Sequence, residues 1–309
     1  MYEQRFQLKR RPFPATPDDS FYYPATGHEQ ALQSLLRAIQ EDEGLILLTG
    51  GPGLGKTLLA HCLIERLGRD TPTAFLTHSQ FRDASALLQT VLFDLGLDYE
   101  DASEQVLRLR LTDHLLKNSA AGKRFVLLID EAHHLTAELI EELRLLGNLE
   151  AGGKKAFQAL LLAQPEILET LKLSRLAAAQ QRIATRCALE ALGAEEAFDY
   201  LLHHLRLAGA TPEKVLDESA LEVLARGAQG VPRLLNRAAH QALVLADAAA
   251  LTKVDAEAAL EALALLGLSQ DEGEDAADGN ETAETPAFEV GIKGETPPFR
   301  LAQETRRTA

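Results

Sequence analysis

The residues from Gly50 to Thr57 read Gly-Gly-Pro-Gly-Leu-Gly-Lys-Thr, a pattern able to bind phosphate. Glycine lets backbone N–H groups converge on phosphate oxygens without interference from a Cβ atom. The amine of Lys56 can reach the β- and γ-phosphates of a nucleoside triphosphate, and the hydroxyl of Thr57 can ligate Mg²⁺. The spacing predicts a phosphate-binding loop made of Gly50, Gly51, Pro52, Gly53, Leu54, Gly55, Lys56, Thr57 and Leu58.

A second pair of candidate residues, Asp130 and Glu131, follows the continuous apolar segment 125–129. Such a segment is typical of a parallel strand covered on both faces, and carboxylates at its carboxyl end lie where α/β sheets bind ligands. We expect Asp130 to hold Mg²⁺ and Glu131 to polarise the water that attacks a γ-phosphate. His133 and His134 are interpreted as a polar loop before a helix, because no Cys or further His at ligand spacing accompanies them.

The hydrophobic pattern predicts the elements that bring these residues together. Five apolar segments are expected as strands, at 45–49, 73–77, 124–129, 157–163 and 183–189. Helical patterns precede, separate or follow them at about 28–41, 56–67, 80–95, 102–119, 137–147 and 165–179. Strands that alternate with helices imply a parallel sheet with right-handed crossovers. After Leu189 only helical patterns follow, at about 194–207, 217–227, 231–248 and 254–266.

Four parts are predicted along the chain from these patterns. Residues 1–27 form a segment rich in aromatics and prolines, and residues 28–190 form the α/β nucleotide-binding domain. Residues 191–268 form a small all-helical domain. Residues 269–309 are acidic and poor in bulky apolar side chains, a composition typical of a disordered tail.

Composition narrows the class of protein. The chain has 309 residues, is 46% hydrophobic and carries a formal net charge of −15. A chain with this negative charge is not expected to bind DNA independently of sequence, because such binding relies on positive side chains that attract the phosphates. Two cysteines far apart make no disulfide framework and suit a reducing compartment. The sequence shows neither a signal peptide nor a transmembrane segment, so a cytoplasmic protein is expected.

Several short motifs together resemble the AAA+ ATPases and, within them, the ExeA type (general secretion pathway protein A). The motifs lie at 13–23, 28–32, 44–50, 130–135, 161–166, 181–183 and 230–233. This resemblance, which covers residues 1–266, implies an α/β P-loop NTPase fold with a five-stranded parallel sheet and a helical lid. It also implies ATP and Mg²⁺ as ligands. The family's membrane helix and peptidoglycan-binding region have no counterpart in this sequence.

The resemblance implies roles for three further polar residues. Gln164, just past an apolar segment, resembles the first sensor, which hydrogen-bonds the γ-phosphate or the attacking water. Arg233, in Gly-Val-Pro-Arg, resembles the second sensor of the lid. Arg182 resembles an arginine supplied to the nucleotide of a neighbouring subunit, with Arg175 and Arg186 as rivals. An arginine acting in trans requires a homo-oligomer, a ring or a short helix.

The aromatic N-terminal segment leaves two interpretations open. It could wrap the adenine, with His28 nearby and Phe13 or Tyr23 stacking on the base. Its aromatic side chains could equally pack the segment onto the sheet.

Three functions remain open at this point. The first is an ATP-hydrolysing oligomeric switch that acts on an assembly or membrane-associated partner. The alternative is an ATP-dependent DNA-binding regulator of a transposition type, with a basic stripe made of Arg108, Arg110, Lys117, Lys123 and Arg124. The third is a regulatory NTPase that signals through its nucleotide state, with residues 297–301 as a docking peptide.

Overall fold

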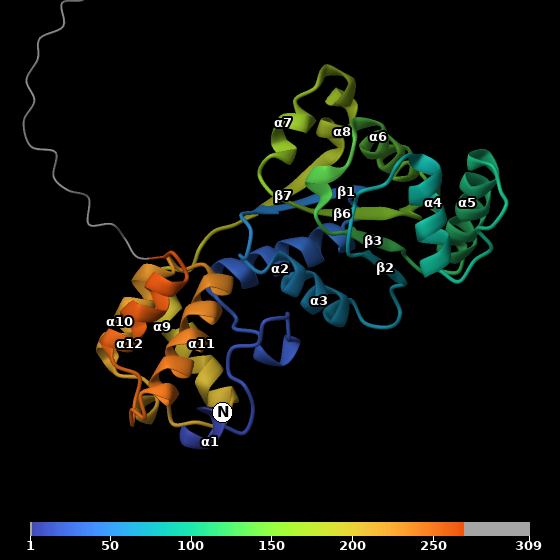
Figure 1. The fold of residues 1–309 in the computed structure, drawn as a ribbon. Helices are drawn as coiled ribbons and strands as arrows, with labels where there is room; N and C mark the ends of the chain where they lie inside the picture. Colours follow the sequence, from blue (N-terminus) through green and yellow to red (C-terminus); the bar gives the residue numbers. More distant parts are fainter. Residues whose placement is uncertain (1, 269–309) are drawn as a thin grey trace, which may run out of the picture. The chain divides into compact units, whose positions relative to one another are not determined.

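A five-stranded parallel sheet is the centre of the computed structural model, which describes residues 2–268 (Figure 1). The strand order is β2-β3-β6-β1-β7, and every neighbouring pair is parallel. The strands are β1 (Leu45–Gly50), β2 (Thr73–Leu76), β3 (Val126–Ile129), β6 (Gln158–Ala163) and β7 (Ile183–Leu189). The sequence prediction of five parallel strands is confirmed.

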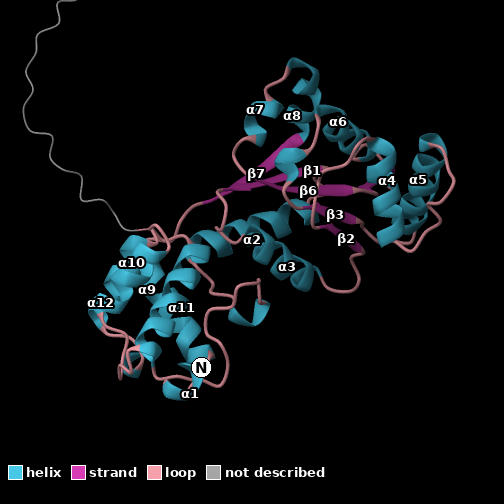
Figure 2. Ribbon diagram, in the orientation of Figure 1, coloured by secondary structure: helices cyan, strands magenta, loops and turns pink. Residues whose placement is uncertain are grey.

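Alternating side chains of the strands enter two separate cores. Ile46 and Leu48 of β1 face a core shared with α2 (Thr26–Gln40) and α3 (Lys56–Leu67). Leu45 and Leu47 face the opposite core, together with the helices α4 (Ala84–Asp94), α5 (Glu104–Ala120), α6 (Ala137–Leu146), α7 (Ile167–Leu171) and α8 (Ala177–Arg182). Both faces are therefore covered, as an uninterrupted apolar strand requires. Figure 2 shows the strands between these helices.

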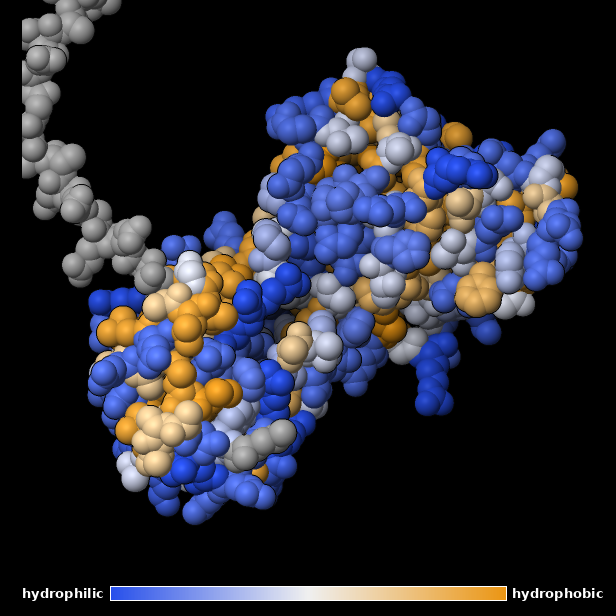
Figure 3. All heavy atoms as spheres, viewed as in Figure 1, coloured by the Kyte–Doolittle hydropathy of each residue, from blue (hydrophilic) through white to orange (hydrophobic). Residues whose placement is uncertain are grey.

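The described chain after β7 is helical and has its own core. Its helices are α9 (Ala194–Leu207), α10 (Glu218–Gly227), α11 (Pro232–Ala248) and α12 (Ala256–Leu265). The N-terminal segment, which begins with the short helix α1 (Tyr2–Arg5), packs into this core through Tyr2, Phe6, Leu8 and Phe13. In Figure 3 hydrophobic residues also gather on the surface of the helical part, and Leu260 and Leu265 of α12 are exposed.

The structure differs from the sequence expectations in one helix, in one hairpin and in the packing of the aromatic segment. The helix predicted at 165–179 is two short helices, α7 and α8, joined by the 3-10 turn Ser174–Leu176, because Leu173 has an extended backbone. A two-residue hairpin, β4 (Glu150–Ala151) and β5 (Lys154–Lys155), was not predicted. The aromatic segment packs mainly on the helical part, whereas its Tyr22 packs against the core that the sheet shares with α2 and α3.

Two further predictions concern the C-terminal tail and membrane-spanning segments. The predicted disordered tail, 269–309, lies outside the described residues. Within residues 2–268, no helix is long and apolar enough to cross a membrane.

Candidate nucleotide-binding site

The predicted phosphate-binding loop joins β1 to α3. Gly53 has φ +81° and Gly55 has φ +92°, conformations that side chains with a Cβ rarely adopt. The helix begins at Lys56, so its N-terminal backbone N–H groups and the positive end of its dipole face the loop. His28 of α2 supports the turn, with Nε2 2.8 Å from the carbonyl oxygen of Leu54. This geometry suits an anion held by backbone donors.

Lys56 folds back over the loop that precedes it. Its Nζ donates to the carbonyl oxygens of Gly50 at 2.8 Å and Gly51 at 3.0 Å. Burial lowers the pKa of Lys56, and the carboxylates of Glu131 and Asp130 partly oppose this effect. A buried amine that has only neutral carbonyl acceptors is suited to pair with a polyanionic ligand.

Two oxygen ligands for a hard cation lie side by side at the end of β3. The Thr57 hydroxyl donates to Oδ2 of Asp130 at 2.5 Å, and Oδ1 of Asp130 accepts the backbone N–H of Glu131 at 2.8 Å. The parallel register places β3 between β2 and β6, so Asp130 emerges at the carboxyl edge of the sheet. Mg²⁺ prefers oxygen ligands such as these, and the pair fits it.

Glu131, His133 and Gln164 form the next cluster. Glu131 has φ +52°, a left-handed conformation that is uncommon for a residue other than glycine. His133 Nε2 lies 3.5 Å from Oε2 of Glu131 and 3.2 Å from the side-chain amide nitrogen of Gln164. Its Nδ1 accepts the backbone N–H of Gln164 at 3.3 Å, so the ring proton of the neutral form is on Nε2. Burial lowers the pKa of His133 and favours this neutral form.

His133 is the residue of this cluster that sequence reasoning missed. It joins the two strand ends that carry Glu131 and Gln164. The 3-10 turn Ala132–His134, which follows Glu131 directly, brings its ring back over the site. The signal was present in its position two residues after Glu131, but the fold of that turn could not be read from the sequence.

Arg233 connects the helical part of the chain to the phosphate-binding loop. Its backbone N–H donates to the carbonyl oxygen of Gly53 at 3.2 Å. A Cβ atom on Gly53 would lie 2.8 Å from Cβ of Arg233, so the two backbones approach closely. A cavity of about 520 Å³ opens here, within the usual range for small-molecule sites. Its lining includes Pro52, Gly53, Gly55, Lys56, Thr57, Leu58, Glu131, Gln164 and Arg233.

Arg182 does not join this cluster. It is exposed at the end of α8 and is not among the residues that line the cavity. Its two rivals are engaged elsewhere: Arg175 forms an ion pair with Glu138, and Arg186 donates to the carbonyl oxygen of Gln180 at 3.1 Å. The site of one chain therefore contains no contribution from Arg182.

The proposed adenine-stacking residues have different surroundings. Phe13 is 1% exposed, stacks on His204 of α9 and is among the residues that line the cavity. Tyr23 packs edge-on against Tyr200 and is not among the lining residues. Phe13 therefore stays a candidate for the edge of a base site, while Tyr23 contributes to packing.

The predicted basic stripe is largely neutralised within the chain. Arg108 pairs with Glu142 at 2.8 Å and Arg110 with Asp98 at 2.9 Å. Two further ion pairs, Lys117–Asp113 and Arg124–Asp42, involve two of the three other predicted cations. These pairs give no support to the DNA-binding alternative, which stays a prediction.

Comparisons with known proteins agree with this geometry. Residues 38–171 match the family model described as an AAA domain. The chain is 37% identical over 247 residues, 80% of its length, to general secretion pathway protein A of Aeromonas hydrophila, and it spans 45% of that protein.

Solved structures share the fold at low sequence identity. The ORC2 protein of Aeropyrum pernix superposes with a TM-score of 0.64 at 17% identity, over 83% of this chain and 71% of that one. Cdc6p of Pyrobaculum aerophilum gives 0.63 at 18%, over 79% and 70%. The RuvB motor of Thermotoga maritima gives 0.55 at 20%, over 86% and 76%. The chain is therefore an AAA+ ATPase with a P-loop NTPase fold, of the type found in general secretion pathway protein A.

Proposed function

We propose that this chain hydrolyses ATP to ADP and phosphate with Mg²⁺ and that the hydrolysis drives an oligomeric switch. The observation that carries the proposal is the hydrogen bond between Thr57 and Asp130, next to Lys56 and Glu131 at the mouth of one cavity. Hydrolysis of a phosphoanhydride needs anion donors, a cation site and a group that orients water, and all three meet here. The ORC2 structure was solved as complexes with ADPNP and ADP, which is consistent with a nucleotide site in this fold.

Each side chain has a definite task in this proposal. Lys56 and the N–H groups at the start of α3 bind the β- and γ-phosphates. Thr57 and Asp130 hold Mg²⁺, which when bound neutralises charge on the phosphate oxygens. Glu131 accepts a proton from the attacking water.

Two further side chains position these groups. Gln164, whose backbone N–H donates to Nδ1 of His133, holds its side-chain amide toward the γ-phosphate. Arg233 contacts the γ-phosphate from the helical part, and its backbone bond to Gly53 joins that contact to the loop. A nucleotide bound here would therefore be sensed by α11, which begins one residue before Arg233.

The oligomer is proposed because the site of one chain holds no Arg182. This residue lies at the end of α8, beside the edge strand β7. A neighbouring subunit that inserted Arg182 would stabilise charge on the transferring phosphoryl group. Nucleotide state would then change contacts between subunits and so act on an assembly or membrane-associated partner. The name of the A. hydrophila relative, general secretion pathway protein A, suggests such a partner.

Substitution of the loop lysine tests the nucleotide site. Wild-type protein should release phosphate from ATP with Mg²⁺ and lose this activity when Mg²⁺ is removed. Lys56→Ala should weaken ATP binding and abolish turnover, because the buried cation that pairs with phosphate is gone. Lys117→Ala, whose amine pairs with Asp113 on the surface, is the matched control and should keep both. Equal turnover by Lys56→Ala and wild type would refute the assignment.

A further inference from the structure

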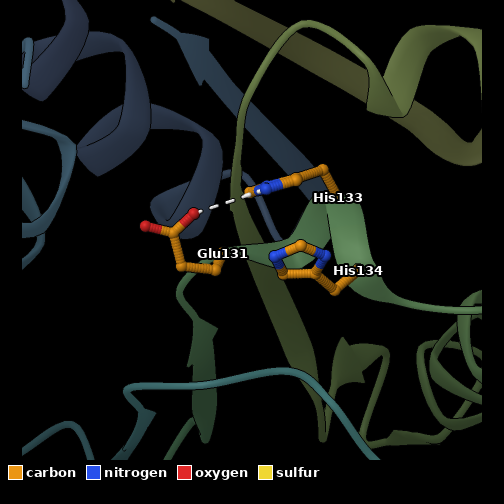
Figure 4. Close-up of side chains that lie close together, drawn as sticks. All are labelled: Glu131, His133 and His134. Atoms are coloured by element: carbon orange, nitrogen blue, oxygen red, sulfur yellow. Dashed lines mark ion pairs between the residues drawn. The ribbon is translucent and has the colours of Figure 1, made fainter. Parts of the chain in front are cut away.

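Three potential metal ligands lie together where β3 ends. One ligand atom each from Glu131, His133 and His134 lies within 4.8 Å of the other two (Figure 4). The 3-10 turn Ala132–His134 produces this cluster, because it folds the two imidazoles back toward the carboxylate of Glu131. The two rings are 4.1 Å apart between centroids, and His134 is exposed.

We propose that Glu131, His133 and His134 bind a transition-metal ion of the Zn²⁺ class. Two imidazoles and one carboxylate are a donor set that Zn²⁺ takes in proteins, with the fourth position open to water. Metal–ligand bonds of about 2.0–2.1 Å place tetrahedral ligands about 3.3 Å apart. The Nε2–Oε2 distance of 3.5 Å between His133 and Glu131 is close to this value. His134 is free to make the small rotation that completes the trio, because its side chain is at the surface.

This site differs from the Mg²⁺ site in its donor atoms. Thr57 and Asp130 offer only oxygen, which Mg²⁺ prefers, whereas the trio offers two imidazole nitrogens. Borderline-soft ions such as Zn²⁺ favour imidazole, and Mg²⁺ does not. Millimolar Mg²⁺ should therefore leave the trio open to micromolar zinc.

Occupancy of the trio has a consequence for hydrolysis, which rests on the function proposed above. Glu131 would be a metal ligand, so its carboxylate oxygen could no longer accept a proton from water. Metal binding at Nε2 of His133 would place the ring proton on Nδ1, so Nδ1 could no longer accept the backbone N–H of Gln164. Zinc binding should therefore inhibit ATP turnover.

Metal binding is measured first, on the full chain without nucleotide, with Co²⁺ as the visible probe. Wild type should develop the ligand-field absorption of one tetrahedral Co²⁺, which Zn²⁺ then displaces. His134→Ala and Glu131→Gln should each bind at least about tenfold more weakly. The matched control, His114→Ala, changes a histidine of α5 and should bind as wild type does. Equal Co²⁺ affinity in His134→Ala and wild type would overturn the proposal.

Turnover is measured next, at saturating Mg-ATP and buffered free zinc. His134→Ala should keep basal turnover within about twofold and need about tenfold more zinc for half-inhibition than wild type. Inhibition of both proteins at the same zinc concentration would contradict the inhibitory role. A wild-type protein that binds Co²⁺ but hydrolyses no ATP would refute the proposed function and leave the metal site standing, since the binding readout needs no turnover.

Discussion

His204 holds the N-terminal segment against the helical part. Its Nδ1 lies 2.9 Å from the carbonyl oxygen of Pro12, and its ring stacks between Phe13 and Phe21. Its Nε2 is buried and has no hydrogen-bond partner among the described residues. A buried ring nitrogen without an acceptor cannot take up a proton without cost.

This burial predicts a pH dependence of stability. Burial lowers the pKa of His204 from 6.5 to about 4, with His203 and Arg10 adding to the effect and Asp18 and the bond to Pro12 opposing it. Because the folded pKa lies below the unfolded one, the stabilisation is complete above pH 6.5 and is lost as the pH falls to about 4. The loss amounts to about 3 kcal/mol.

Urea unfolding at pH 7 and pH 4 measures this loss. The fall in unfolding free energy should be about 3 kcal/mol larger in wild type than in His204→Gln, which cannot take up a proton there. Parallel pH profiles for the two proteins would show that His204 does not titrate on unfolding.

Among the site residues, those that follow a strand or lie in the glycine loop could be predicted from sequence. Lys56, Thr57 and Asp130 are examples, because the strand–loop–helix order fixes where they emerge. His133 could not be predicted, because its role depends on the backbone of Glu131, which turns left-handed and starts the 3-10 turn. Local backbone geometry of this kind leaves no periodic pattern.

At the level of elements, the loop after β1 and the start of α11 act as one unit. Arg233 donates its backbone N–H to Gly53, and Gly53 has φ +81°. Glycine is required at position 53 because a Cβ atom would collide with Arg233 and because residues with a Cβ rarely adopt this φ.

Substitution of Gly53 by alanine tests this contact. Gly53→Ala should lower ATP affinity at least about tenfold, because charge-assisted contacts of about 1.5–3 kcal/mol depend on the position of the Arg233 side chain. Gly68→Ala is a matched control: Gly68 has φ +72°, and its added Cβ would meet nothing within 4 Å. It should lose about 1–3 kcal/mol of stability, because few residues other than glycine adopt φ +72° with ψ −177°, and it should bind ATP normally. Titration with a fluorescent ATP analogue measures the ATP affinity of both variants. Equal ATP affinities of Gly53→Ala and wild type would contradict a role of this contact in ATP binding.

The elements themselves differ in how far the sequence predicts them. Strands such as β1 were placed nearly to the residue, because they are uninterrupted apolar segments between helical patterns. The region 165–179 was predicted as one helix from its apolar pattern. The backbone of Leu173, which is not helical, divides it and lets Leu171 and Leu176 stay buried. The helix is interrupted because Leu171 and Leu176 both pack into the core of the sheet. Such tertiary packing cannot be predicted from the local sequence pattern.

For the whole molecule, the proposed oligomer predicts that two inactive variants restore activity to each other. Arg182→Ala keeps an intact phosphate site but supplies no arginine to its neighbour, so its turnover should fall about 10³–10⁵-fold. Lys56→Ala lacks its own site but can supply Arg182. A mixture of the two should regain turnover, because some sites then combine an intact loop with an arginine from the neighbour.

The rival arginines provide the controls for this mixing experiment. Arg175→Ala and Arg186→Ala, whose side chains are engaged within their own chain, should keep near-normal turnover. An unchanged activity of the mixture relative to Arg182→Ala alone would contradict action in trans.

The most direct test of the central claim compares ATP binding and ATP turnover in Glu131→Gln. The substitution keeps the size of the side chain and removes the carboxylate that accepts the proton from water. Glu131→Gln should bind ATP with an affinity within about twofold of wild type and turn it over about 10²–10⁴-fold more slowly, and the surface variant Glu65→Gln should be unaffected. Near-normal turnover by Glu131→Gln would contradict the assignment of Glu131 and the catalytic site built around it.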